Sequence, residues 1–211
     1  RSLRMLRVPY VISGSGKTVP EDTGTYPKSA LVTTDTEIES QSMVDYLCSC
    51  GHKRIAFITS GDEGLGRCHL NGYKRSLEKN GLEYDEKLII RLKPGKRIYT
   101  IENGYNCTCE LLKSGVDFSC IYAISDTLAV GACRAVIDSG KRVPEDYCVA
   151  GADGQDIAEY YHPSITTLKY PRVEIALQSV RTLFDLINRK KVVKRQILGG
   201  TLIERESTRK L

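Results

Sequence analysis

The sequence predicts an α/β fold with parallel strands. Short apolar segments rich in β-branched residues alternate along the chain with longer segments whose apolar residues recur at helical spacing. Region 121–154 shows this most clearly, with a strand at 121–124, a polar turn, a striped helix ending at Gly140 and a second strand at 149–151. Because a crossover helix returns the chain to the same edge in the same direction, the two strands are expected to pair in parallel.

The first half of the chain reads as strands joined by helices and polar segments. Strands are predicted at 7–12, 30–33, 55–59 and 88–90. A long polar segment, Ser13–Ser29, separates the first two strands. The helix after the second strand is expected to begin with a capping box, in which Thr36 is the N-cap and Glu39 reaches back to it. The next helix carries Leu70 and Tyr73 on its apolar face and ends at a glycine.

The second half continues the alternation. A helix striped by Ile101, Tyr105 and Leu112 precedes the 121–154 region. Strands at 165–168 and 201–204 flank a helix that is expected to start at Pro171.

Composition excludes some classes of protein. The chain has 211 residues, of which 41% are hydrophobic and 27% charged, so it can bury a real core. It contains no apolar run of about eighteen residues and no secretory signal after Arg7, so a cytoplasmic protein without a membrane span is expected. The net charge of +5 is scattered and does not by itself indicate a nucleic-acid surface.

The cysteines and glycines give no metal or cofactor motif. The eight cysteines are expected to be reduced and mostly buried. Cys48 and Cys50, like Cys107 and Cys109, are spaced two apart in predicted helices, where side chains point to nearly opposite sides and do not share one ion. The glycine-rich segment 60–66 fits neither the dinucleotide nor the phosphate-binding pattern. No cofactor, no metal and no catalytic set of residues is therefore expected, and the protein is not predicted to be an enzyme.

Seven segments together resemble, in order, the effector-binding region of LacI/GalR-type transcriptional repressors. They are Gly51–Ile58, Gly72-Tyr73, Tyr99–Tyr105, Ser125–Ala132, Val143–Asp146, Gly151–Asp153 and Leu202–Arg209. The resemblance implies two Rossmann-like subdomains of periplasmic-binding-protein type, joined by three crossovers, with a sugar or other small metabolite between them.

Applied to this chain, the resemblance implies a carboxy-terminal subdomain of residues 34–163 plus 194–211. Residues 1–33 plus 164–193 would form an incomplete amino-terminal subdomain. DNA would be contacted only through a helix-turn-helix that these 211 residues do not contain. A cytoplasmic homodimer is implied, in which ligand binding changes operator binding. A periplasmic-type sugar-binding transport protein is the alternative, and eight unpaired thiols argue against it.

The resemblance also implies which residues contact the effector. Asp153 matches the family's ligand-binding aspartate, although an Asp in that position also stabilises a turn with Gly154. Ser125 and Asp126 match a polar pair at the neighbouring loop, where either residue also suits a helix N-cap. Tyr99 matches an aromatic residue that stacks on the ligand, with a buried packing role as the alternative.

Two positions depart from the family pattern. His69 stands where the family usually has an arginine that clamps the ligand, and a neutral imidazole does not make that bidentate contact. Arg67, two residues earlier, is a candidate substitute. Ala152 occupies a position that is usually aromatic. These departures leave the chemical nature of the effector open.

Overall fold

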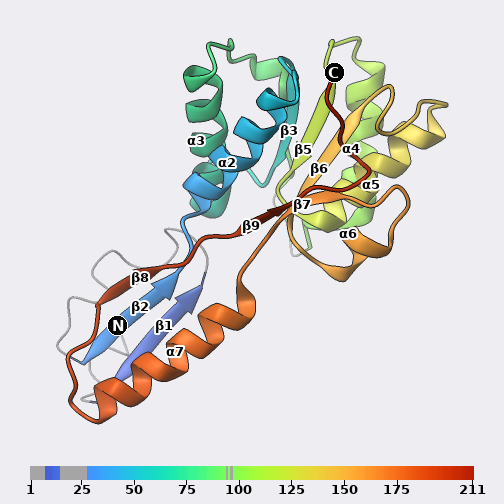
Figure 1. Ribbon diagram of the computed structural model, residues 1–211. Helices are drawn as coiled ribbons and strands as arrows, with labels where there is room; N and C mark the ends of the chain where they lie inside the picture. Colours follow the sequence, from blue (N-terminus) through green and yellow to red (C-terminus); the bar gives the residue numbers. More distant parts are fainter. Residues whose placement is uncertain (1–7, 15–27, 94, 96) are drawn as a thin grey trace.

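The computed structural model describes residues 8–14, 28–93, 95 and 97–211, and its strands form two sheets (Figure 1). The strands are β1 (Tyr10–Gly14), β2 (Ser29–Thr33), β3 (Ile55–Thr59), β4 (Ile89–Arg91), β5 (Cys120–Ala123), β6 (Cys148–Asp153), β7 (Thr166–Lys169), β8 (Arg195–Ile197) and β9 (Thr201–Ile203). The helices are α2 (Thr36–Ser49), α3 (Gly64–Lys79), η2 (Glu86–Leu88), α4 (Ile101–Lys113), α5 (Asp126–Asp138), α6 (Asp156–Tyr160) and α7 (Arg172–Ile187).

The larger sheet has six strands in the order β4-β3-β5-β6-β7-β9. All its pairs are parallel except β7 with β9, which is antiparallel. The predicted parallel pairing in region 121–154 is confirmed, since Ile121 lies opposite Val149. The central strands are buried throughout, which suits a parallel sheet covered on both faces.

Two pairs of helices cover this sheet from opposite sides, α2 with α3 and α4 with α5 (Figure 1). Two glycines allow α4 and α5 to pack closely. A Cβ atom on Gly131 would lie 2.0 Å from the Ile101 carbonyl oxygen, and one on Gly104 would lie 2.2 Å from that of Leu128. Both distances are far below van der Waals contact, so the crossing depends on the absence of side chains there.

The smaller sheet has three strands in the order β1-β2-β8, and α7 packs on β1 and β2. The chain passes between the two sheets three times, at residues 34–35, 170–171 and 198–200. The sheets differ from the expected subdomain boundaries at two strands. β7 lies in the larger sheet, whereas residues 164–193 are expected in the smaller unit, and β8 lies in the smaller sheet, whereas residues 194–211 are expected in the larger one. β7 pairs with β6 and β9, and β8 pairs with β2, so backbone hydrogen bonds fix the sheet to which each strand belongs.

Several local expectations need correction. Asp35, not Thr36, caps α2, because its carboxylate accepts from the Glu37 and Ile38 N–H groups at 3.1 and 3.3 Å. β8 and α6 are not predicted from the sequence, because they are too short to show a periodic pattern. Arg7, at the start of the first predicted strand, and most of the predicted polar segment 13–29 lie outside the described residues.

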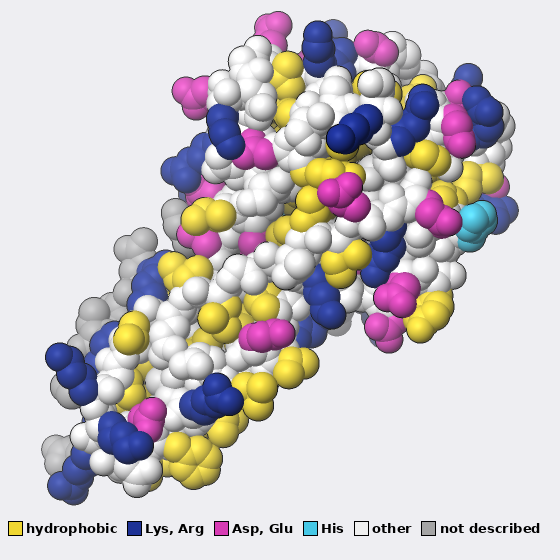
Figure 2. Space-filling model, viewed as in Figure 1, with side chains coloured by type: hydrophobic (Ala, Val, Ile, Leu, Met, Phe, Trp, Pro, Cys, Tyr) yellow, Lys and Arg dark blue, Asp and Glu magenta, His cyan; other side chains and the backbone are white. Residues whose placement is uncertain are grey.

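The outer side of α7 is apolar, as Figure 2 shows along the smaller body of the molecule. Its exposed apolar residues are Val173, Leu177, Val180, Phe184 and Ile187. They recur every three or four residues and so form one stripe on the helix surface. Within the described part of the chain, no helix is long and apolar enough to cross a membrane.

Candidate functional site

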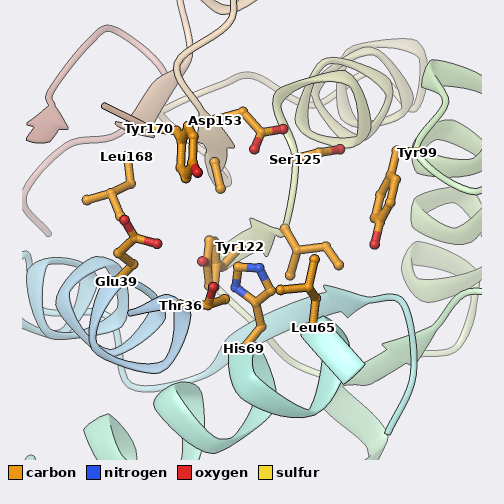
Figure 3. Close-up of a pocket in the computed structure, with 12 residues that line it drawn as sticks. Thr36, Glu39, Leu65, His69, Tyr99, Tyr122, Ser125, Asp153, Leu168 and Tyr170 are labelled. Atoms are coloured by element: carbon orange, nitrogen blue, oxygen red, sulfur yellow. The ribbon is translucent and has the colours of Figure 1, made fainter. Parts of the chain in front are cut away.

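A cavity of about 130 Å³ opens at the carboxyl ends of β5 and β6 (Figure 3). It is lined by Thr36, Glu39, Leu65, His69, Tyr99, Tyr122, Ile124, Ser125, Ala152, Asp153, Leu168 and Tyr170. This is the edge at which open α/β sheets bind their ligands. A cavity of about 150 Å³ holds benzene, so this one has room for a group close to the size of a single six-membered ring.

Asp153 is the last residue of β6, and its side chain points into the cavity (Figure 3). Its φ of 104° is unfavourable for a residue with a side chain, and strain of this kind collects at functional sites. The Gln155 side chain donates a hydrogen bond of 3.0 Å to its carboxylate. Burial raises the pKa of Asp153. The geometry therefore accommodates both roles considered for Asp153, cavity lining and stabilisation of the turn.

Asp126 does not line the cavity. One of its carboxylate oxygens accepts the Thr167 hydroxyl at 2.6 Å, and the other accepts the Gln155 N–H at 2.6 Å. Burial raises its pKa to about 6, although these two bonds oppose the shift. A Cβ atom on Gly151 would lie 2.4 Å from this carboxylate, so the glycine makes room for it. Asp126 thus holds the loop that follows Asp153 rather than facing the space where a ligand would lie.

Ser125 and Tyr99 both lie on the cavity wall. The Ser125 hydroxyl also accepts the Leu128 N–H at 3.3 Å, so this residue is the N-cap of α5 as well. Tyr99 precedes α4 and is 43% exposed, which does not agree with the alternative of a buried packing residue. Its ring stands across the cavity from Glu39 (Figure 3).

His69 and Arg67 lie on α3 and point in different directions. His69 lines the cavity, and burial lowers its pKa to about 4, so the imidazole is neutral at pH 7. Its Nδ1 atom is buried without a hydrogen-bond partner among the described residues. Arg67 is exposed, does not line the cavity, and donates to the Asp62 carbonyl oxygen at 2.7 Å. The structure therefore does not place Arg67 as a substitute for the missing arginine clamp.

Two polar residues of α2, Thr36 and Glu39, line the cavity and were missed as site residues. Thr36 is 3% exposed, and its hydroxyl has no hydrogen-bond partner in the described chain. The Glu39 Oε1 atom is likewise buried and unpartnered there. Burial raises the pKa of Glu39 to about 6. In the sequence both residues fit a capping box, so their polarity does not by itself indicate a ligand site.

Burial of an unpartnered polar atom costs free energy, about 1–3 kcal/mol each. Thr36, Glu39 and His69 each contribute one such atom, and all three residues line the same cavity. Tyrosines complete the wall, as Tyr122 and Tyr170 do beside Glu39 (Figure 3). The site offers hydrogen-bonding groups and ring faces, which is the chemistry that binds a polar ring compound. No group of three or more metal-ligating side chains occurs in the residues that the structure covers.

Comparison with known proteins agrees with this architecture. Residues 44–208 match the family model "Periplasmic binding protein-like domain". The HTH-type transcriptional regulator MalR of Clostridium butyricum is 41% identical over 146 residues, which are 69% of this chain and 42% of that protein. The chain spans about half the length of the curated relatives it matches.

Two solved structures with bound sugars are also similar. The transcriptional regulator CelR–cellobiose complex superposes with a TM-score of 0.79 at 32% identity, covering 95% of this chain and 59% of that one. A LacI-family regulator from Enterococcus faecium with bound ribose has a TM-score of 0.78 at 28% identity, covering 96% and 72%. These relatives are transcriptional regulators and not enzymes or transport proteins. The chain belongs to the periplasmic binding protein-like family and is an effector-binding domain of the LacI-family regulators.

Proposed function

We propose that this domain binds a sugar in the cavity at the ends of β5 and β6 and so controls operator binding by a cytoplasmic homodimeric regulator. The observation that carries the proposal is the set of buried, unpartnered polar atoms on Thr36, Glu39 and His69 around one cavity. A sugar hydroxyl both donates and accepts hydrogen bonds, so it suits a hydroxyl, a carboxylate and a neutral imidazole together.

The tyrosines support a ring-shaped ligand. Tyr99 is partly exposed at one end of the cavity, and Tyr170 lies at the other end beside Glu39 (Figure 3). Aromatic faces pack well against the apolar C–H face of a sugar, while their hydroxyls remain available for hydrogen bonds. The bound sugars of the two similar structures, cellobiose and ribose, belong to the same chemical class.

The position of the cavity suggests how binding would reach the rest of the protein. Thr36 directly follows the first passage between the sheets, and Tyr170 lies within the second. Gly200, in the third passage, lies beside Glu39, since a Cβ atom on it would be 3.1 Å from Glu39 Oε1. A ligand that contacts these residues would stabilise one arrangement of the two bodies over another, and this differential binding is what shifts a conformational equilibrium.

The apolar stripe on α7 supports association with a further surface, and we assign a second copy of the protein to it. Phe184 is 60% exposed and Leu177 is 53% exposed, values unusual for large apolar side chains on one helix face. Contiguous exposed apolar surface commonly marks a protein interface. In the proposed regulator this pairing would bring two DNA-binding heads together, as two operator half-sites require.

Thermal unfolding with a panel of neutral sugars, including cellobiose and ribose, tests the effector site. A sugar that binds the folded state raises Tm, by an amount that grows with its concentration above Kd. We expect Asp153→Ala to abolish the rise given by the best ligand of the panel. Asp156→Asn is the matched control, because Asp156 is exposed and does not line the cavity.

The possible results of the thermal-shift experiment test the location of the site and the class of ligand separately. A rise that persists undiminished in Asp153→Ala would remove this cavity as the binding site. The absence of any rise across the panel would contradict the proposal that the domain binds a sugar. Operator control is measured separately, by DNA binding of the full-length regulator with and without the best sugar.

A further inference from the structure

We propose that the cavity selects effectors without negative charge, because Glu39 and Asp153 present two carboxylates to the bound ligand. The inference rests on the proposed effector function and narrows its ligand class. Both side chains point into the cavity, one from α2 and the other from the end of β6 (Figure 3). The ligand thereby meets carboxylates from two directions.

The two carboxylates interact with each other. Burial is the main cause of the raised pKa of Glu39, and the negative charges of Asp35 and Asp153 add to it. Electrostatic repulsion of this kind acts between groups that share a poorly solvated region. A phosphate or carboxylate placed between them would add a further negative charge to that region, and juxtaposed like charges cost several kcal/mol.

Among the described residues, no cationic side chain forms part of the cavity wall. No lysine or arginine is among the described residues that line the cavity. Arg67 is turned to the Asp62 carbonyl, and His69 is neutral because burial lowers its pKa. Arg172 acts on Asp153 from outside the lining and lies over the Tyr170 ring at 6.0 Å. Anionic ligands are usually held by arginine forks or lysine ammonium groups, and this wall offers neither.

The wall is suited to hydrogen-bond donors instead. An ionised carboxylate accepts hydrogen bonds and has none to donate. Thr36 is 3% exposed, and its hydroxyl, without a partner in the described chain, adds one group that serves as donor or acceptor. A neutral polyhydroxy ligand satisfies all of these groups at once, whereas a phosphate ester leaves the carboxylates facing its oxygens.

Matched pairs of neutral and anionic probes test the inference on the effector-binding domain. The pairs are ribose with ribose 5-phosphate, glucose with glucose 6-phosphate, and cellobiose with cellobionic acid, measured by thermal shift and then by titration calorimetry at pH 7.5. We expect the neutral member of the best pair to bind at least about tenfold more tightly than its anion. Glu39→Gln should reduce this ratio several-fold, whereas Glu83→Gln, which removes an exposed carboxylate outside the cavity, should leave it unchanged.

Each result bears on a different claim. An anion that binds as tightly as its neutral partner, with binding abolished by Asp153→Ala, would overturn the charge selection and leave the effector cavity in place. A ratio that Glu39→Gln does not change would also overturn the inference, because the discrimination would then come from elsewhere. A complete lack of binding by every probe would overturn this inference and the proposed function together.

Discussion

Glu39→Gln is expected to make the ligand-free domain more stable at neutral pH. Burial raises the pKa of Glu39 from 4.5 to about 6 in the folded protein, so the folded state disfavours the ionised carboxylate. The stabilisation from the protonated form is fully present below pH 4.5 and is lost as the pH rises through 6. A glutamine keeps the shape of the side chain and carries no charge at any of these pH values.

The size of the effect follows from the pKa shift. Raising the pKa from 4.5 to about 6 corresponds to about 2 kcal/mol. Glu39 is only partly buried as a residue, so solvent screening reduces this to about 1 kcal/mol. For a chain of this length, about 1 kcal/mol raises Tm by about 2–4 °C.

Urea unfolding of both proteins between pH 4.5 and 7.5 measures this difference. We expect the smallest difference near pH 4.5, where Glu39 of the folded protein is almost entirely protonated, and a gap that opens to about 1 kcal/mol in favour of the variant at pH 7.5. Glu83→Gln, at an exposed position, should show no such gap. A variant that is less stable than the wild type at pH 7.5, or a difference that is constant with pH, would refute the reasoning.

Three further predictions concern the loop anchor, the helix crossing and the apolar stripe. Thr167→Val removes a donor to the buried Asp126 carboxylate and should cost about 1–2 kcal/mol at pH 7.5, and less at pH 5, where that carboxyl is mostly protonated, in the same urea assay. Gly131→Ala should destabilise the domain by about 3 kcal/mol, although alanine has the better helix propensity, because the added methyl group meets the Ile101 carbonyl oxygen. Urea unfolding measures this loss, and an unchanged stability would contradict the prediction. The double change Leu177→Lys and Phe184→Lys should lower self-association in sedimentation velocity with stability within about 0.5 kcal/mol, and undiminished association would exclude the α7 stripe as the contact surface.

Local sequence pattern determined the larger part of the fold. The strand predicted at 55–59 has the same bounds in the structure, and the others in the larger sheet differ by one or two residues. Apolar β-branched runs and glycine helix ends are local signals, so they predict strands and helix ends without information on which segments pack together. The same holds for Asp153, since the carboxyl end of a buried parallel strand lies at the ligand edge of the sheet wherever that strand lies.

The side chains that complete the cavity were decided by tertiary structure. Asp126 follows β5 as Asp153 ends β6, yet the Asp126 carboxylate does not line the cavity. It accepts a hydrogen bond from Thr167, which is 41 residues away. Arg67 and His69 are two residues apart on one helix, and their different directions bring only the histidine to the wall.

The sequence by itself determined the α/β alternation, the parallel central strands and the position of Asp153 at their edge. Only the tertiary structure brought Glu39 and Thr36 of α2 against that edge, more than 80 residues before Ser125 in the chain. The physical reason is that burial and charge at a cavity depend on which distant segments meet there. A pattern within a single helix records which face is apolar, but it does not record what lies opposite its first turn.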